Sequence, residues 1–477
     1  MNQKRMPLYE RLLFHQKVNP ISFHVPGHKN GLLYGDEVFS RFLQLDLTEL
    51  TGLDDLHDPQ EEIAEAERLL TEYYGTKKSY FLVNGSTVGN LAMIMAVCNA
   101  GDTVLVQRNC HKSILNGLML ANVNPVFISP IMDEKLLTPS GIDAEMMKKA
   151  LKQYPMTKAC IFTYPDYYGQ TYELEKMIEA AHEADIPVLI DEAHGPHFVY
   201  GEPFPPSALS LGADLVVHSA HKMLPAMTMG SYLHINGERV SEKKVKFYLS
   251  VLQSSSPSYP IMASLDFARS YLANINDEDI GYLLQTRVEF INRINEISEL
   301  FVMESPDPLK LMIRHPALSG YELQSIFEEM AIFPEMADPY QVLFTFPLLK
   351  EGMEYPFNDA IKRMEVYPWS SIRSDRQIIE ANEYPNNKIS QLSFSYKEMQ
   401  ELDEKWVKMN EAVGQIASKM TIPYPPGIPL LLPGEEITKK HMKQLQSLIE
   451  AGARFQGDVE QLKIGKIAVF HQSLCGK

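Results

Sequence analysis

The sequence contains few cysteines and no long apolar run, and these shortages exclude several classes of protein. Its 477 residues include four cysteines, Cys98, Cys110, Cys160 and Cys475, without Cys-x-x-Cys spacing. Neither a zinc site nor a disulfide framework is therefore indicated, and we expect reduced thiols and no bound metal. No apolar run of about 18 residues could span a bilayer, and the N-terminus lacks the apolar segment of a signal peptide. We expect a cytoplasmic protein with no membrane partner.

Basic residues are also scarce relative to acidic ones. The chain carries 44 Lys and Arg against 61 Asp and Glu, a formal net charge of -17. This excess of negative charge disfavours binding to nucleic acid, which depends on clustered Lys and Arg. Residues 191–194 spell DEAH, which is typical of nucleic-acid motors, but the chain has no G-x-x-x-x-G-K-[ST] P-loop to bind nucleotide phosphates. Asp191 therefore needs another explanation.

The sequence does contain a regular alternation of short apolar segments and helical patterns. A helix is predicted to start at Asp58-Pro59, with Asp58 as its cap, and Gly75 marks its end. Continuous apolar strands separated by helices predict an α/β fold with a mainly parallel sheet covered by helices. In such sheets ligands bind beyond the carboxyl ends of the strands. The strand candidates are residues 79–83, 103–106, 125–129, 159–163, 187–191 and 214–219.

The alternation weakens after about residue 280, which suggests further, smaller domains. We expect an N-terminal arm and large domain at residues 1–295, a small α/β domain at 296–385 and a C-terminal domain at 386–477. The two smaller domains are expected to be of the α+β type. A Pro-rich run at residues 421–436 precedes the last helical segment, and its composition is compatible with a linker that nothing recognises.

Three groups of polar residues at predicted strand ends indicate a site for pyridoxal phosphate. Gly85, Ser86 and Thr87 begin a helix whose N-terminus suits a phosphate, although Ser-Thr before a helix is by itself more often a plain N-cap. Asp191 ends an apolar strand, where a carboxylate needs a cation such as a protonated pyridine nitrogen. Lys222 follows the next strand and could serve as an amine nucleophile, although a lone lysine is usually a solvated surface charge. The three together, in this order, are what the cofactor requires.

Nine motifs, spread over nearly the whole chain, resemble those of the bacterial ornithine/lysine/arginine decarboxylases, which have the aspartate-aminotransferase fold. They are HVPGHKNG, GLDDLHDP, NGSTVGN, RNCHKS, TYPDYYG, DEAHG, HSAHKMLP, SSSPSYPIMASLD and YPPGIPLLLPGE. The resemblance implies a large domain like that of pyridoxal phosphate-dependent transferases and the decarboxylation of a basic amino acid for polyamine synthesis. We expect arginine to be converted to agmatine, with lysine to cadaverine and ornithine to putrescine as the next choices. Another enzyme of this fold type, such as an aminotransferase or a lyase, would share the same three groups and remains the alternative.

The resemblance also implies roles for individual residues. Lys222 is similar to the lysine that forms a Schiff base with the cofactor, Asp191 to the partner of the pyridine nitrogen, and His111 to the imidazole stacked on the ring. Ser254 is similar to a phosphate contact supplied by a neighbouring subunit, which implies a homodimer with shared active sites. The chain resembles the short, biosynthetic members, because it begins without the response-regulator-like domain of the large ones. Further cofactor contacts are implied for Gly85, Ser86, Thr87, Ala193, His194, Ser219 and His221.

Two of the motifs have more than one interpretation. HVPGHK, with His24, His28 and Lys29, is either a local Pro-Gly turn or a loop that reaches the active site of a partner subunit. GLDDLHDP contains Asp54 and Asp55, which could attract a cationic substrate at the mouth of the site, but the end of this motif is already explained as a helix start.

Overall fold

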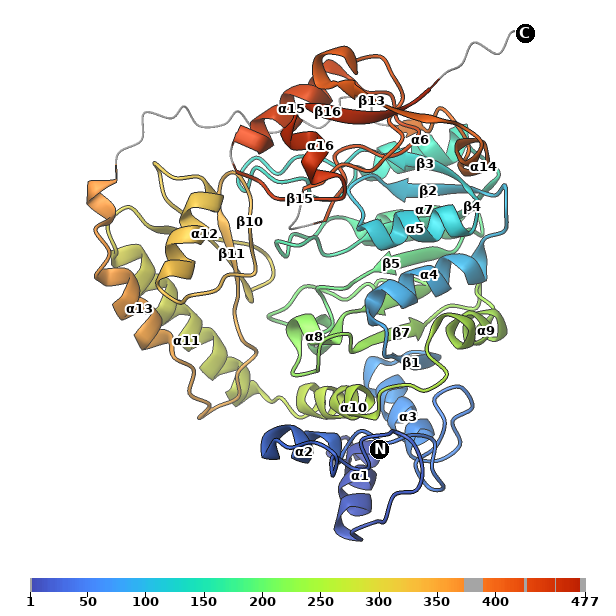
Figure 1. Ribbon diagram of the computed structural model, residues 1–477, viewed down its shortest axis with the longest axis vertical. Helices are drawn as coiled ribbons and strands as arrows, with labels where there is room; N and C mark the ends of the chain where they lie inside the picture. Colours follow the sequence, from blue (N-terminus) through green and yellow to red (C-terminus); the bar gives the residue numbers. More distant parts are fainter. Residues whose placement is uncertain (1, 373–388, 424–426, 451, 472–477) are drawn as a thin grey trace. The chain divides into compact units, whose positions relative to one another are not determined.

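The structure, a computed structural model, describes residues 2–372, 389–423, 427–450 and 452–471 (Figure 1). The described residues of Met1–Cys98 and Leu174–Asn276 form a first compact unit, and those of Asn99–Glu173 and Asp277–Lys477 form a second. The predicted domain boundary between residues 385 and 386 lies outside the described residues. Among the described helices, none has the length and apolar character that crossing a membrane requires.

The first unit contains four strands in the order β1-β7-β6-β5. β5 and β6 are parallel, whereas β7 runs antiparallel to both β1 and β6. The predicted strands at 79–83, 187–191 and 214–219 are confirmed as β1, β5 and β6, and β7 was not predicted. The elements of this unit are α1 (Pro7–Lys17), α2 (Glu37–Leu43), α3 (Glu62–Tyr74), β1 (Lys78–Leu82), α4 (Gly85–Val97), α7 (Leu174–His182), β5 (Val188–Asp191), β6 (Leu215–His218), α8 (Ala220–Met223), β7 (Ser231–Ile235), α9 (Glu242–Leu252) and α10 (Tyr259–Ala273).

Helix α4 packs very closely onto the strands of this unit because it carries a glycine at the contact. A Cβ atom on Gly89 would lie 2.7 Å from the side chain of Leu82 in β1 and 2.9 Å from that of Val217 in β6. A larger residue at this position would require a shift of these side chains or of the helix. Gly89 therefore determines how near the first turn of α4 lies to the ends of β5 and β6.

The predicted start of α3 is wrong. The helix begins at Glu62, not at Pro59, and Asp58 does not cap it. The cap is Asp54, whose carboxylate accepts hydrogen bonds from the backbone N–H groups of Gln60, Glu61, Ile63 and Ala64 at 2.8–3.2 Å. A carboxylate at a helix N-terminus pairs with N–H groups that have no partner inside the helix, and here it comes from a residue outside the usual capping position. The predicted end at Gly75 is confirmed, with φ of 64°.

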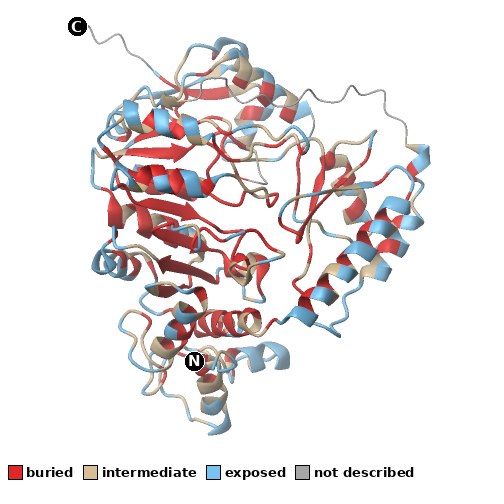
Figure 2. Cartoon of the chain, turned by 180° about the vertical axis from the view of Figure 1, so that it is seen from behind, coloured by how far each residue is buried: buried red, intermediate tan, exposed pale blue. Residues whose placement is uncertain are grey.

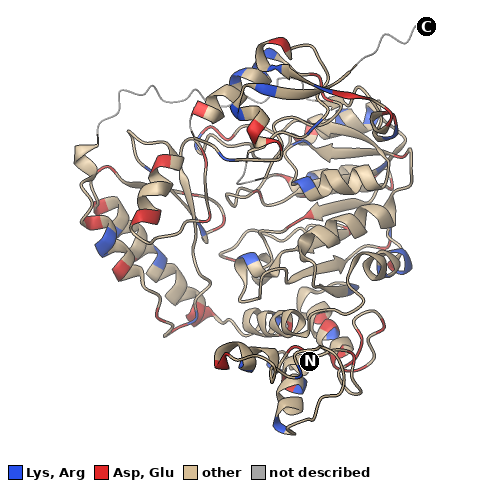
Figure 3. Cartoon of the chain, in the orientation of Figure 1, with Lys and Arg blue, Asp and Glu red and all other residues tan. Residues whose placement is uncertain are grey.

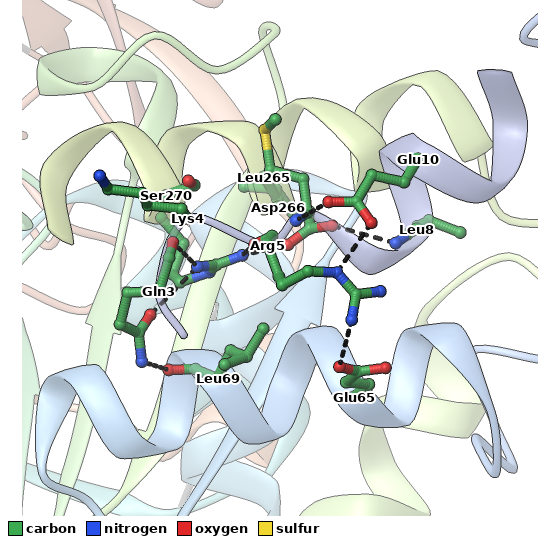
Figure 4. A network of polar contacts seen from close by, with 12 residues as sticks. Gln3, Lys4, Arg5, Leu8, Glu10, Glu65, Leu69, Leu265, Asp266 and Ser270 are labelled. Carbon is green, nitrogen blue, oxygen red and sulfur yellow. Dashed lines mark hydrogen bonds and ion pairs between the residues drawn. The ribbon is translucent and has the colours of Figure 1, made fainter. Parts of the chain in front are cut away.

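A buried ion pair holds the N-terminal segment against α10 (Figure 4). Arg269 and Asp266 are both fully buried and lie 2.6 Å apart. The guanidinium of Arg269 also donates to the backbone oxygens of Gln3 and Arg5, and Asp266 accepts from the N–H of Leu8 at 3.0 Å. The backbone just before and inside α1 thus pairs with most polar groups of the ion pair, while Nε of Arg269 has no hydrogen-bond partner among the described residues.

The second unit contains a further four strands, in the order β4-β2-β3-β12, and a separate four-stranded sheet, β10-β11-β9-β8. β2 is parallel to both β3 and β4, as predicted for residues 103–106, 125–129 and 159–163. These elements are β2 (Thr103–Gln107), α5 (Lys112–Leu120), β3 (Asn124–Ile128), α6 (Ala144–Gln153), β4 (Thr157–Thr163), α11 (Asp277–Glu296), β8 (Phe301–Glu304), β9 (Lys310–Arg314), α12 (Gly320–Glu329), β10 (Met336–Ala337), β11 (Val342–Thr345), α13 (Phe357–Glu365) and β12 (Ile389–Gln391).

The remaining elements of the second unit belong to its C-terminal part. They are α14 (Tyr396–Gln400), β13 (Glu404–Lys408), β14 (Ile422–Pro423), α15 (Lys439–Glu450), β15 (Phe455–Gln456), α16 (Val459–Lys463) and β16 (Lys466–Phe470). β13 pairs with β16, and β14 pairs with β15, both antiparallel. A small core that includes Leu431, Ile437 and Val469 supports them.

The central strands are apolar and buried in both units, as Figure 2 shows. β2, β3 and β6 contain no Lys, Arg, Asp or Glu (Figure 3). Three cysteines lie among the described residues. Cys98, Cys110 and Cys160 are buried and form no disulfide, and Cys475 lies outside the described part of the chain.

Candidate active site

The first turn of α4 presents hydroxyl groups and backbone N–H groups at one place in the first unit. The helix begins at Gly85, whose φ of 77° lies in the left-handed region that favours glycine, and no side chain caps it. Ser219, at the end of β6, donates a hydrogen bond from its Oγ to the Oγ of Ser86 at 2.7 Å. Ser86 is half-buried, whereas Thr87 is exposed. An uncapped helix start with adjacent hydroxyls suits a phosphate group.

Asp191 is a buried carboxylate at the carboxyl end of β5. Its side chain is 3% exposed, and it accepts hydrogen bonds from Nδ2 of Asn90 at 2.9 Å and from the N–H of Ala193 at 3.3 Å. Neither partner carries a charge. No Lys or Arg among the described residues forms an ion pair with Asp191. A buried carboxylate with only neutral partners fits a ligand that brings its own positive charge, such as a protonated ring nitrogen.

Lys222 lies in the short helix α8, directly after β6. Its Nζ is 3.1 Å from Nε2 of His194, a residue that is 4% exposed. The resemblance implied a cofactor contact for His194, and the structure shows that its side chain contacts the lysine amine. The imidazole is therefore in a position to hold the amine and to exchange a proton with it.

Two other expected phosphate contacts also lie in the first unit. Nδ1 of His221 is 3.0 Å from the carbonyl oxygen of Gly230, so the backbone of that residue orients the ring. Ser254 is exposed, and its N–H donates to Oδ1 of Asn84, the residue before α4, at 3.4 Å. Ser254 thus lies beside the helix start of its own chain.

His111 lies in the second unit as the N-cap residue of α5. Its Nδ1 accepts hydrogen bonds from the N–H of Ser113 at 3.3 Å and from its hydroxyl at 2.8 Å. These two donors fix the plane of the imidazole and place its proton on Nε2. Of the expected site residues, all except His111 are brought together in the first unit.

Sequence reasoning missed the roles of two polar residues, one in each unit. Asn90 follows Ser86 by four residues on α4, so both lie on one face of the helix. The available signal in the sequence was an amide residue within a largely apolar helix, and the structure shows that this Asn is fully buried. The second residue is Arg108, whose guanidinium makes two bonds of 2.7 Å to the carboxylate of Glu435 and further bonds to the carbonyl oxygens of Pro429 and Leu430. The described part of the Pro-rich run is therefore bound by an arginine.

The two motifs left open in the sequence have local structural partners. In HVPGHK, Nζ of Lys29 donates to the carbonyl oxygen of His24 at 2.6 Å, and Nε2 of His28 lies 3.3 Å from Asp46. These contacts describe a turn closed within one chain and do not test a role in a partner subunit. In GLDDLHDP, Asp54 caps α3 as described above, so its carboxylate is already occupied.

Comparison with known proteins gives concordant matches. A family model described as Orn/Lys/Arg decarboxylase, major domain, matches residues 6–310, and one described as Orn/Lys/Arg decarboxylase, C-terminal domain, matches residues 381–463. The uncharacterized protein YaaO of Bacillus subtilis is 45% identical over 95% of this chain and 96% of its own length. An arginine decarboxylase of the same organism is 33% identical over 96% of each chain. The crystal structure of the Francisella novicida lysine decarboxylase LdcF matches with a TM-score of 0.81 at 21% identity, over 97% of this chain and 80% of that one.

Proposed function

Because the chain belongs to the Orn/Lys/Arg decarboxylase family, as its motifs predicted, we propose that it converts arginine to agmatine. Membership makes it a pyridoxal phosphate-dependent decarboxylase of a basic amino acid. The choice of arginine is supported by relatives named arginine decarboxylase, which are 32% and 33% identical over most of the chain, whereas the constitutive lysine decarboxylase of Escherichia coli is 23% identical. Lysine and ornithine are the alternative substrates.

The assignment of the site rests on the group formed by Lys222, Asp191 and the first turn of α4. We assign Lys222 as the residue that bonds the cofactor, Asp191 as the partner of its ring nitrogen, and the first turn of α4 with Ser219 as its phosphate site. Pyridoxal phosphate, when bound, supplies an aldehyde that bonds the substrate amine and a ring that accepts the electron pair left by CO₂.

Asp191 and its neighbours act through charge. Asn90 and the N–H of Ala193 both donate to the buried carboxylate, and hydrogen bonds of this kind favour the negative charge of a carboxylate. That charge favours a proton on the ring nitrogen, and the electron-accepting capacity of the ring depends on this proton. Asn90 is therefore a positioning residue, since it orients the carboxylate without reaching the reacting atoms.

His194 and Lys222 would handle protons during the reaction. Lysine is a nucleophile only as a neutral amine, so a base must accept one of its protons. Nε2 of His194, at 3.1 Å from the amine, is placed to take that proton and to return it. We assign stacking on the ring to His111, whose orientation is fixed by Ser113.

A homodimer is proposed on two grounds. Ser254 is exposed, as a residue that serves a partner subunit would be. The N-terminal segment, in addition, exposes large apolar side chains that a monomer would leave in water, among them Ile21 at 85%, Phe23 at 93% and Leu32 at 81%. Location in the cytoplasm stays a prediction.

The substrate assignment is tested by incubating purified, cofactor-loaded protein with labelled arginine, lysine and ornithine in parallel, and by measuring CO₂ and the amine formed. A pocket built for a guanidinium pairs it in two parallel bonds, which an ammonium cannot reproduce. We expect kcat/KM for arginine to exceed the others by about 10²-fold, equivalent to about 2.7 kcal/mol. A lead of this size for lysine or ornithine would replace arginine as the substrate. Absence of CO₂ release from all three would refute the proposed reaction.

A further inference from the structure

The second unit contains a cavity of about 110 Å³ that no step of the proposed reaction uses. One part of its wall is the loop after β4, which carries the TYPDYYG motif, and another is the segment around Thr138. Tyr321 and Leu448 contribute apolar surface from α12 and α15. A single water needs roughly 10–15 Å³ of such space, so the cavity can hold a ligand with several non-hydrogen atoms.

Four side-chain oxygens in the wall of this cavity are buried and have no hydrogen-bond partner among the residues that the structure describes. They are Oδ1 of Asn109, Oγ1 of Thr138, Oγ1 of Thr163 and Oδ2 of Asp166. The four residues are between 3% and 7% exposed. Buried polar atoms are normally paired, so four unpaired acceptors around one cavity indicate a missing donor.

Asp166 indicates the charge of that donor. Its Oδ1 accepts from the N–H groups of Tyr168 and Gln170 at 2.9 Å, which fixes the carboxyl group, while Oδ2 remains unpaired. Burial raises the pKa of Asp166 to about 7; the charge of Asp133 adds to the shift, and that of Lys310 opposes it. A cation bound at Oδ2 would favour the ionised carboxylate.

The rest of the wall suits an organic cation with a short apolar chain. Tyr168 donates its hydroxyl to Asp338 at 2.6 Å, so its ring is held in place and a second carboxylate lies at the cavity. Aromatic rings and carboxylates together bind guanidinium and alkylammonium groups through charge and cation–π attraction. Leucine side chains of the wall, such as Leu430, would cover the alkyl part.

We propose that this cavity is a binding site for a guanidinium or alkylammonium group, with Asp166 as its charged ligand and Asn109, Thr138 and Thr163 as further acceptors. If the bound group is the side chain of the substrate, the site rests on the proposed function, and if it is a separate amine, the site goes beyond that function. Two sources share this chemistry, namely the side chain of a basic amino acid and a separate amine.

Calorimetric titration of the cofactor-loaded protein with propylguanidinium tests the proposal, and propylurea serves as an uncharged probe of the same shape. We expect propylguanidinium to bind and propylurea not to bind. Asp166→Asn keeps the size of the side chain and removes its charge, so the dissociation constant should rise by about 10- to 100-fold. Because burial raises the pKa of Asp166 and a bound cation would lower it, binding near neutral pH should also release protons, seen as a dependence of the heat on the buffer, and this release should vanish in Asp166→Asn.

Two further variants control the test. Asp143→Asn removes the same charge from the exposed N-cap of α6, where Asn serves equally well, and should bind propylguanidinium like the unchanged protein. Thr163→Val replaces an unpaired hydroxyl by a methyl group, so it should not lower the unfolding temperature but should weaken binding by about 3- to 10-fold. If Asp166→Asn does not fold, the affinity of Thr163→Val for propylguanidinium tests the proposal in its place.

Steady-state kinetics with arginine distinguish the two sources. If the cavity receives the side chain of the substrate, propylguanidinium should raise the apparent KM and leave kcat unchanged. If it receives a separate amine, propylguanidinium should change kcat, and saturating arginine should not abolish the effect. Equal affinity of Asp166→Asn and the unchanged protein, or equal binding of propylurea, would overturn the proposal.

Discussion

Replacement of Asp191 by asparagine tests the centre of the proposed site. The substitution preserves the volume of the side chain but removes its charge. It also replaces one of two acceptor oxygens by an N–H₂ donor, whereas Asn90 and Ala193 both require an acceptor. The variant would therefore lose the charge opposite the ring nitrogen and one of two buried hydrogen bonds.

These two losses have separate magnitudes. Removal of one preorganised electrostatic contact typically lowers kcat by about 10²- to 10³-fold, equivalent to about 2.7–4 kcal/mol. One buried N–H left without a partner costs about 1–3 kcal/mol of stability. We thus expect kcat to fall at least about 10²-fold and the unfolding temperature to fall as well.

A variant of a second buried carboxylate in the same unit separates the loss of kcat from the loss of stability. Asp214 is fully buried at the amino end of β6, where it accepts from the N–H of Val188 at 2.8 Å. Asp214→Asn should lower the unfolding temperature and leave kcat per bound cofactor nearly unchanged. The assay is initial-rate decarboxylation normalised to cofactor content, measured by absorbance. Near-normal kcat in Asp191→Asn with cofactor bound would refute the role given to this carboxylate.

Three further variants test the rest of the site. Lys222→Ala should abolish turnover, and borohydride should attach the cofactor to Lys222 in the unchanged protein; labelling of another lysine would show that the assignment is wrong. His111→Ala should lower kcat only about two- to tenfold, because stacking contributes about 0.5–1.5 kcal/mol, and thermal unfolding should reveal the loss of the α5 cap. Ser254→Ala should be impaired alone and should regain activity when its chains exchange with those of Lys222→Ala, since one of the two sites in a mixed dimer is then intact. No recovery after verified exchange would argue against shared sites.

The strands of the fold were predictable because their signal is local. Each predicted segment is a short apolar run with a polar residue after it, and this pattern depends only on neighbours in the sequence. The start of α3 was not predictable in the same way. Asp58-Pro59 has the composition of a helix start. The free N–H groups at the start of α3 are instead bonded by Asp54, whose backbone has a φ of 67°. The competing cap is visible only in three dimensions.

The positions of the candidate site residues in the fold were predictable for the same reason. Lys222 and Asp191 follow strands directly, so their side chains had to lie at the carboxyl edge of a sheet. The pairing of Arg108 with Glu435 joins residues far apart in the sequence, and no local pattern indicates it. The unpaired oxygens around Asp166 likewise come from separate parts of the chain, namely the segments after β2 and β3 and the end of β4 with the loop that follows it, and only the folded chain brings them to one cavity.

Two neighbouring carboxylates of the DEAH motif have different hydrogen-bond partners. Asp191 and Glu192 are consecutive and both buried, but Glu192 accepts from Ser207, from the N–H of Ala208 and from His218 at 2.7–2.8 Å. The carboxylate of Glu192 thus accepts three hydrogen bonds from the protein, whereas that of Asp191 accepts two. Because both carboxylates are buried, the difference lies in their partners and not in their exposure. A buried carboxylate to which the protein donates fewer hydrogen bonds keeps acceptor capacity that a cationic ligand can use.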